Sequence, residues 1–256
     1  MSLRFIRRAV ALGYVLIASI ASFWLMRLTG PRTLERRARW VQETCIRVLR
    51  SMDIRCDVEG PIPTRGVVVA NHLSYLDIVI LSAAMPCFFV AKFEIGQWPY
   101  FGRAARVGGT IFLDRSSLAS AEKVAAIISE RLKLPIPVLF FPEGTSTDGT
   151  MLRFRSRLFE PAIVAGAPIT AASIRYVVND GIPERELCWF GDDSFGPHLL
   201  KTLNTPEFRA ELRFGEPRVY SDRRMAADET FAEIAAMREG ACGRAQAEAK
   251  EVLQPA

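Results

Sequence analysis

A histidine and an aspartate, His72 and Asp77, stand five residues apart directly after an apolar stretch. The stretch, Val67-Val-Val-Ala, predicts a buried strand, and a helical pattern begins near Tyr75. Open α/β sheets place ligand sites where strands end and helices begin. An imidazole there is suited to take a proton from a hydroxyl group, and a carboxylate in the first helical turn can orient it. The pair therefore indicates general-base catalysis on an alcohol.

The same residues also fit a purely structural role. Ser74 and Asp77 have the spacing of a capping box, in which Asp77 would satisfy amides at the start of the helix. His72 would then be an ordinary loop histidine. The chain has only one other histidine, His198, and it lies outside every motif described below. This window alone leaves both interpretations open.

Two further apolar stretches end in polar residues. Residues 108–115 predict a strand that ends in Asp114 and Arg115, and an arginine followed by two serines can clamp a phosphate. A surface pair between Arg115 and Asp114 is the alternative. Residues 140–147 predict a strand that ends in a glycine-containing turn with hydroxyl groups. The amides of such a turn can hold a phosphate or an oxyanion, although a plain turn has the same composition.

Together these segments resemble the glycerolipid acyltransferase family, particularly its 1-acylglycerol-3-phosphate acyltransferases. The N-H-x-x-x-x-D pattern of the family corresponds to Asn71, His72 and Asp77, and its G-x-I-F-[IL]-D-R pattern corresponds to residues 109–115. The F-P-E-G-T-R-S pattern matches residues 141–145 and then departs, because Ser146 stands where the family usually has arginine.

The resemblance extends to two less specific segments. Lys92 and Glu94, followed by Pro99 and Gly102, are similar to a K-x-E and P-x-x-G segment of the family. Pro168 lies in an apolar segment where the family has a proline that begins a strand. The similar region runs from about residue 71 to residue 169, in the expected order and spacing.

The resemblance implies direct transfer of a fatty acyl group from acyl-CoA or acyl carrier protein to the hydroxyl of a lysolipid. His72 would deprotonate the acceptor and Asp77 would orient His72. Backbone amides near Gly144, or a nearby side chain, would stabilise the oxyanion. No cofactor and no metal site is expected, because the acyl thioester is itself a substrate and no ligand cluster is evident. The residues expected to bind substrate are Asn71, Lys92, Arg115, Glu143, Gly144, Thr145 and Pro168.

Ser146 raises the question of the acceptor, because arginines in these motifs are the expected partners of a substrate phosphate. Either another arginine substitutes, with candidates at positions 153, 155 and 157, or the acceptor carries less negative charge, as a lyso-ornithine lipid does. Retention of Arg115 favours 1-acylglycerol-3-phosphate, which would give phosphatidic acid. Two other classes of function are a thioester or lipid hydrolase and a non-catalytic lipid-binding scaffold. The intact pair of His72 and Asp77 argues against the scaffold.

The N-terminal segment predicts a membrane anchor. Residues 9–26 carry no charge, and eighteen helical residues extend ~27 Å, close to the thickness of a bilayer core. The run is long for a signal peptide and lacks a good cleavage site, and a buried core helix is the other alternative. Arginines flank both ends, with slightly more after the run, which favours a cytoplasmic catalytic domain. An anchor that enters the bilayer and returns would fit equally well.

Composition agrees with this organisation. The net charge of +5 suits an anionic lipid or an acidic carrier protein better than nucleic acid, since aromatic residues do not interleave the arginines. Five scattered cysteines suggest reduced thiols. Residues 33–52 predict an amphipathic helix, so residues 1–52 form the anchor region and residues 53–256 form the acyltransferase domain. Alternating strands and helices predict an α/β fold, a mixed sheet flanked by helices. The predicted strands cover residues 65–70, 87–92, 110–114, 137–141, 169–177 and 210–214, and helices after the anchor region cover 75–84, 118–133, 158–165 and 228–253.

Overall fold

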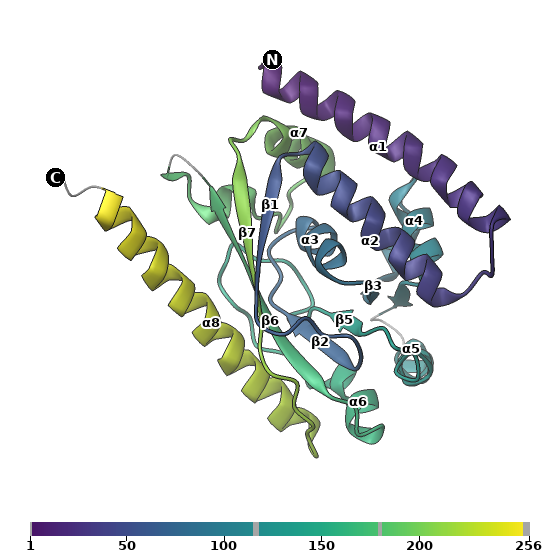
Figure 1. Cartoon of the computed structure of the whole chain (residues 1–256). Helices are drawn as coiled ribbons and strands as arrows, with labels where there is room; N and C mark the ends of the chain where they lie inside the picture. Colours follow the sequence, from purple (N-terminus) through teal and green to yellow (C-terminus); the bar gives the residue numbers. More distant parts are fainter. Residues whose placement is uncertain (1, 115–117, 179–180, 253–256) are drawn as a thin grey trace.

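A seven-stranded mixed sheet forms the centre of the structure, a computed structural model that describes residues 2–114, 118–178 and 181–252 (Figure 1). The strand order is β1-β7-β6-β2-β5-β3-β4, and every neighbouring pair is parallel except β6 and β7. The strands are Ile54–Glu59 (β1), Val67–Ala70 (β2), Phe88–Lys92 (β3), Ile111–Leu113 (β4), Val138–Phe140 (β5), Ile169–Val178 (β6) and Phe208–Phe214 (β7). This confirms the predicted α/β class.

Helices cover both faces of the sheet (Figure 1). One apolar core lies between the sheet and α2, α3 and α7, and a second lies between the sheet and α5, α6 and α8. Val68 belongs to the first core and its neighbours Val67 and Val69 belong to the second, as the alternation of side chains along a strand requires. The helices are Leu3–Leu28 (α1), Leu34–Ser51 (α2), Leu76–Ala84 (α3), Phe101–Gly108 (α4), Leu118–Arg131 (α5), Glu160–Val164 (α6), Phe195–Asn204 (α7) and Arg223–Val252 (α8).

All six predicted strands are present, whereas β1, α4 and α7 were not predicted. Strand β1 lies at the edge of the sheet, and beyond Ile54 its side chains are partly or fully exposed. Such a strand lacks the apolar run that marks a central strand. Helices α4 and α7 are short, with eight and ten residues, which gives few turns from which a helical period can be recognised.

The parallel strands position the candidate site. Strands β2, β5, β3 and β4 run in the same direction, so their carboxyl ends lie at one edge of the sheet. His72 follows β2, the turn at residues 141–146 follows β5, and Lys92 ends β3. Three predicted motifs far apart in the sequence are therefore brought to the same edge.

Helix α1 lies along the domain and is attached over its length (Figure 1). Near its start, the Arg8 side chain is buried, and its Nε donates to Oδ2 of Asp53 at 2.8 Å while its Nη1 donates to the carbonyl of Thr205 at 2.6 Å. Further along, the hydroxyls of Ser19 and Tyr100 share a hydrogen bond, which joins α1 to the segment before α4.

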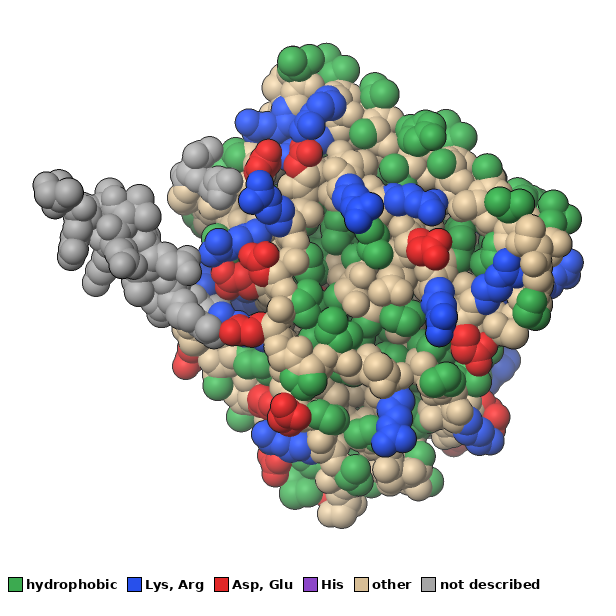
Figure 2. Space-filling model, viewed as in Figure 1, with side chains coloured by type: hydrophobic (Ala, Val, Ile, Leu, Met, Phe, Trp, Pro, Cys, Tyr) green, Lys and Arg blue, Asp and Glu red, His purple; other side chains and the backbone are tan. Residues whose placement is uncertain are grey.

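The outward face of α1 is apolar. The helix has 26 residues, and its most apolar 18-residue window has a mean hydropathy of 2.0. Only 11% of that window is buried, so most of the helix is not covered by the domain. Figure 2 shows hydrophobic side chains along the upper edge, where α1 runs in Figure 1. The exposed large side chains recur every three or four residues along the helix, except for the adjacent pair Trp24 and Leu25: Leu3, Ile6, Val10, Tyr14, Ile17, Ile20, Trp24, Leu25 and Leu28.

Candidate active site

His72 and Asp77 are in direct contact. Nδ1 of His72 lies 2.7 Å from Oδ2 of Asp77, and the imidazole stacks on the ring of Phe141 with centroids 3.9 Å apart and an angle of 7° between the planes. These two contacts hold the ring in one orientation. The other ring nitrogen, Nε2, is left for a substrate, because His72 lines a large cavity and its side chain is 17% exposed.

Asp77 has both of the roles that the sequence left as alternatives. Oδ2 of this buried carboxylate accepts hydrogen bonds from the amides of Leu73 at 2.7 Å and Ser74 at 3.0 Å, so it caps the entry to α3. The same oxygen binds His72. The cap fixes the carboxylate, and the carboxylate fixes the imidazole.

Tyr176, on β6, completes the set of contacts around Asp77. Its hydroxyl donates a hydrogen bond to Oδ1 of Asp77, and its side chain is buried. Burial, together with the neighbouring Asp77 carboxylate, raises the pKa of Tyr176, so the hydroxyl keeps its proton. Sequence reasoning missed this residue because it lies 99 positions from Asp77 and belongs to none of the motifs.

The backbone of His72 is held from the segment after β5. Oε1 of Glu143 accepts a hydrogen bond from the His72 amide at 2.8 Å, and the Thr147 amide donates to the His72 carbonyl at 3.0 Å. Oε2 of Glu143 accepts from the amide of Leu152 at 2.8 Å. Glu143 is buried, and burial raises the pKa of its carboxyl. Its two oxygens hold main-chain amides, and Glu143 is absent from the described lining of the cavity.

The turn after β5 presents amides beside His72. Gly144 has a φ of +83°, a left-handed conformation that favours glycine, and its amide donates to the carbonyl of Phe141 at 3.1 Å. The amides of Thr145 and Ser146 have no hydrogen-bond partner in the described part of the chain. All three residues line the same cavity as His72. The amides suited to an oxyanion are therefore those of Thr145 and Ser146.

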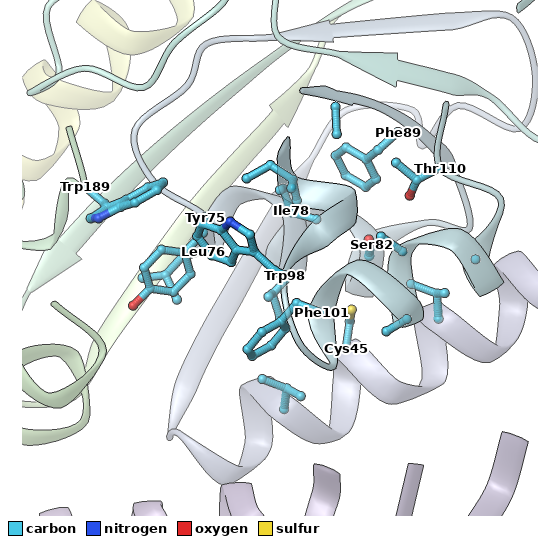
Figure 3. A pocket seen from close by; sticks show the side chains of 18 of the residues that line it. Cys45, Tyr75, Leu76, Ile78, Ser82, Phe89, Trp98, Phe101, Thr110 and Trp189 are labelled. Atoms are coloured by element: carbon cyan, nitrogen blue, oxygen red, sulfur yellow. The ribbon is translucent and has the colours of Figure 1, made fainter. Parts of the chain in front are cut away.

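A cavity of about 510 Å³ extends from His72 between α1, α2, α3 and α4. In Figure 3, Tyr75, Trp98 and Trp189 stand towards one side of the cavity and Cys45, Ser82 and Thr110 towards the other. Lys92 is the only Lys, Arg, Asp or Glu among the described residues that line it. The volume and the apolar lining are those of a site for a long apolar ligand.

Two residues expected to bind substrate lie elsewhere. Both polar atoms of the buried Asn71 amide bind the main chain of Ile174, at 3.0 and 2.8 Å, so this side chain joins β2 to β6. Pro168 precedes β6, which is parallel to β2, and its carbonyl accepts from the amide of Val67 at the start of β2. It therefore lies at the sheet edge opposite His72. Arg115 lies outside the described residues.

The second histidine, His198, is buried and hydrogen-bonded to other parts of the protein. Nε2 of the buried His198 lies 3.1 Å from the carbonyl of Cys188, and Nδ1 lies 3.1 Å from the hydroxyl of Tyr75. A carbonyl only accepts, so Nε2 carries the proton and Nδ1 accepts from Tyr75. Burial lowers the pKa of His198, which keeps the ring neutral. His72 is thus the histidine with a carboxylate partner and access to the cavity.

Comparisons with known proteins agree with this geometry. A family model described as Acyltransferase matches residues 53–175. A lyso-ornithine lipid O-acyltransferase of Rhodobacter capsulatus is 36% identical over 203 residues, which are 77% of this chain and 72% of that protein. A 1-acyl-sn-glycerol-3-phosphate acyltransferase of Neisseria meningitidis is 40% identical over 151 residues, 57% of this chain and 59% of that protein.

The fold also matches a solved structure. The crystal structure of the 1-acyl-sn-glycerophosphate acyltransferase PlsC from Thermotoga maritima has a TM-score of 0.66 to this chain at 22% sequence identity. The match covers 93% of this chain and 97% of that one, and at this identity it concerns the fold alone. The sequence relatives and the family model show that this chain belongs to the acyltransferase family.

Proposed function

We propose that this protein transfers a fatty acyl group from a thioester donor, acyl-CoA or acyl carrier protein, to the hydroxyl of a lysolipid. The observation that carries the proposal is the contact of Asp77 with His72, which lines an apolar cavity of about 510 Å³. A general base needs hydrogen-bond reach to the proton that it takes and an orienting partner behind it. The apolar cavity supplies the place for an acyl chain.

In the proposed reaction, Nε2 of His72 takes the proton of the acceptor hydroxyl as its oxygen attacks the thioester carbonyl. The amides of Thr145 and Ser146 donate hydrogen bonds to the oxyanion that forms. The carbon–sulfur bond then breaks, and the imidazolium returns its proton to the leaving thiolate. The Asp77 side chain, in contact with Nδ1 of His72, stabilises the imidazolium. The products are the acylated lipid and the free thiol of the donor.

Product analysis tests this reaction against its rivals. The purified protein is given labelled acyl-CoA or labelled acyl carrier protein, each with and without a lysolipid, and the labelled products are separated. Acylated lipid that forms only when lysolipid is present supports the proposal. Free fatty acid formed at the same rate with or without lysolipid would indicate a hydrolase, and absence of turnover with either donor would indicate a lipid-binding scaffold.

Two acceptors are candidates, and the site favours a lyso-ornithine lipid over 1-acylglycerol-3-phosphate. Ser146 lines the cavity where the family usually has arginine. The arginines considered as substitutes, Arg153, Arg155 and Arg157, have exposed side chains and are absent from the described lining. The relative named for lyso-ornithine lipid also matches over 203 residues, against 151 for the relative named for 1-acyl-sn-glycerol-3-phosphate. The second candidate is supported by the motif that ends in Arg115.

Competition kinetics with one variant separate the two acceptors. The measurement is kcat/KM for lyso-ornithine lipid and for lysophosphatidic acid, first with the wild type and then with Ser146→Arg. A charge-assisted contact contributes ~1.5–3 kcal/mol. The Ser146→Arg variant should therefore raise kcat/KM for lysophosphatidic acid about tenfold or more. Its kcat/KM for lyso-ornithine lipid should not rise in the same way. Wild-type preference for lysophosphatidic acid, lost in Arg115→Ala, would establish the phosphate acceptor instead.

We further propose that α1 lies in the plane of the membrane surface, with the catalytic domain on the cytoplasmic face. The start of α1 contacts α7 through Ser2 with Asn204, and its end contacts α2 through Thr29 with Arg36. A helix held in this way presents one apolar side to lipid along its length, as interfacial helices do. The arrangement supports an anchor held at one surface of the membrane, in preference to a perpendicular span.

A further inference from the structure

A second recess, of about 260 Å³, lies at the connection between α1 and α2, apart from the active-site cavity. Four arginines line it together with apolar side chains that include Phe23 and Val107. The arginines are Arg27 at the end of α1, Arg32 in the connection, and Arg36 and Arg37 in the first turn of α2. The recess therefore combines a high density of positive charge with an apolar wall.

None of these four arginines forms an ion pair with a carboxylate in the described part of the chain. Arg37 donates through Nη2 to the carbonyl of Arg106 at 2.8 Å, and Arg36 donates through Nη2 to Oγ1 of Thr29 at 2.8 Å. Nη1 of Arg36 is buried and has no hydrogen-bond partner among the described residues. Like charges held together raise the energy of the recess, and an anion bound among them would lower it.

The recess lies where the exposed apolar face of α1 ends. Trp24, Leu25 and Leu28 are exposed in the last turns of α1, next to Arg27. Figure 2 shows Lys and Arg side chains at the right-hand edge, near the connection that follows α1 in Figure 1. If the apolar face meets lipid tails, these guanidinium groups stand at the level of the lipid head groups.

We propose that this recess binds the phosphate of an anionic phospholipid in the membrane surface, as a site separate from the acceptor site. Guanidinium groups bind phosphate oxygens bidentately, and Phe23 and Val107 provide an apolar wall for the adjoining glycerol and upper chain. The proposal rests on the proposed membrane association of α1. It goes further, because it predicts that anionic phospholipids bind at this recess in particular. A general attraction of a basic protein to an anionic surface would not depend on these four arginines.

The test compares two double variants that lose the same charge. Arg32→Gln/Arg36→Gln removes two guanidinium groups from the recess, and Arg39→Gln/Arg103→Gln removes two exposed ones on α2 and α4 outside it. Binding is measured by flotation with phosphatidylcholine vesicles and with phosphatidylcholine vesicles that contain phosphatidylglycerol. The expected result is that the recess variant loses about tenfold more affinity for the anionic vesicles than the control variant. Both should bind pure phosphatidylcholine as the wild type does.

Equal losses in the two double variants would overturn the proposal, because a diffuse surface charge predicts that result. The proposal would also be overturned if the recess variant bound vesicles as the wild type does but no longer bound an acyl carrier protein. The recess would then be a site for an acidic protein. A wild type that binds neither vesicle would contradict the membrane association itself, and with it this site. Thermal unfolding checks that each variant is folded. If the double variant is not folded, the single variant Arg32→Gln, at an exposed position, provides the test instead.

Discussion

The hydroxyl of Tyr176 on β6 donates a hydrogen bond to Oδ1 of Asp77, the carboxylate oxygen that does not contact His72. Asp77 is thereby held from two directions. The amides of Leu73 and Ser74, just before α3, contact one oxygen, and Tyr176 of β6, the strand next to β2, contacts the other. Both Tyr176 and Asp77 are buried. The orientation of the His72 imidazole is therefore supported by a residue that does not line the cavity.

Tyr176→Phe should lower kcat by about tenfold or more with little change in KM. The ring and its edge-on contact with Phe208 are kept, so the change removes only the hydrogen bond to Asp77. A hydrogen bond to a charged group contributes ~1.5–3 kcal/mol, and each 1.4 kcal/mol is a factor of ten in rate. Steady-state kinetics with a saturating donor measure the effect. Tyr220→Phe, in the core on the other face of the sheet, is the matched control and should keep wild-type kcat.

His72→Ala should remove nearly all acyl transfer while the protein stays folded and bound to membranes. General-base removal typically costs ~100-fold or more in rate. The control variant is His198→Ala, which removes a buried ring that is hydrogen-bonded to Tyr75 and Cys188. It should lower the melting temperature, and the fraction that remains folded should keep its activity. A His72→Ala protein that retains more than about a tenth of wild-type kcat would refute the assignment.

Asp77→Asn should affect both activity and stability, because one carboxylate serves as cap and as partner of His72. Loss of a helix cap costs ~1 kcal/mol, and an amide does not stabilise an imidazolium as a carboxylate does. We expect a fall in kcat comparable with that of His72→Ala, together with a decrease of about 1 kcal/mol in the free energy of unfolding. Loss of stability with kcat unchanged would mean that Asp77 only caps α3.

Glu143→Gln should change how stability depends on pH. Burial raises the pKa of the Glu143 carboxyl above its ordinary value of 4.5. A group whose pKa is higher in the folded chain contributes stability that is full below its unfolded pKa and is lost as pH rises through the folded pKa. Urea unfolding over about pH 4 to 7 should show the wild type losing stability relative to the variant as pH rises. A constant difference across this range would contradict the raised pKa.

Substitutions on the two faces of α1 should affect different properties, membrane binding for the exposed face and activity for the face that lines the cavity. Val10→Asn/Ile17→Asn changes two side chains on the exposed face, so it should release much of the protein from membranes and leave activity in detergent intact. Leu12→Asn/Leu16→Asn changes two that line the cavity, so it should keep membrane binding and lower activity. Membrane flotation and a detergent assay measure the two effects. The proposed in-plane orientation would be wrong if labels at Ser2 and Thr29 reacted from opposite sides of the membrane.

The sequence by itself determined the features that depend on neighbouring residues. The apolar run of β2, the five-residue spacing of His72 and Asp77, and the length of the α1 segment can all be recognised locally. Motif order also predicted the acyltransferase family, which the comparisons confirm. Short-range contacts follow from the strand and helix repeats, so residue types and spacing are enough to predict them.

Only the tertiary structure decided which distant residues meet. β6 carries Tyr176 to Asp77 and places Asn71 against Ile174, while the parallel pairing of β2 and β6 puts Pro168 at the far edge. These contacts depend on strand order and direction, which result from the packing of the whole chain and leave no periodic signal in any one segment. The docking of α1 along the domain has the same origin, because an apolar helix has the same composition whether it crosses a bilayer or lies beside a cavity.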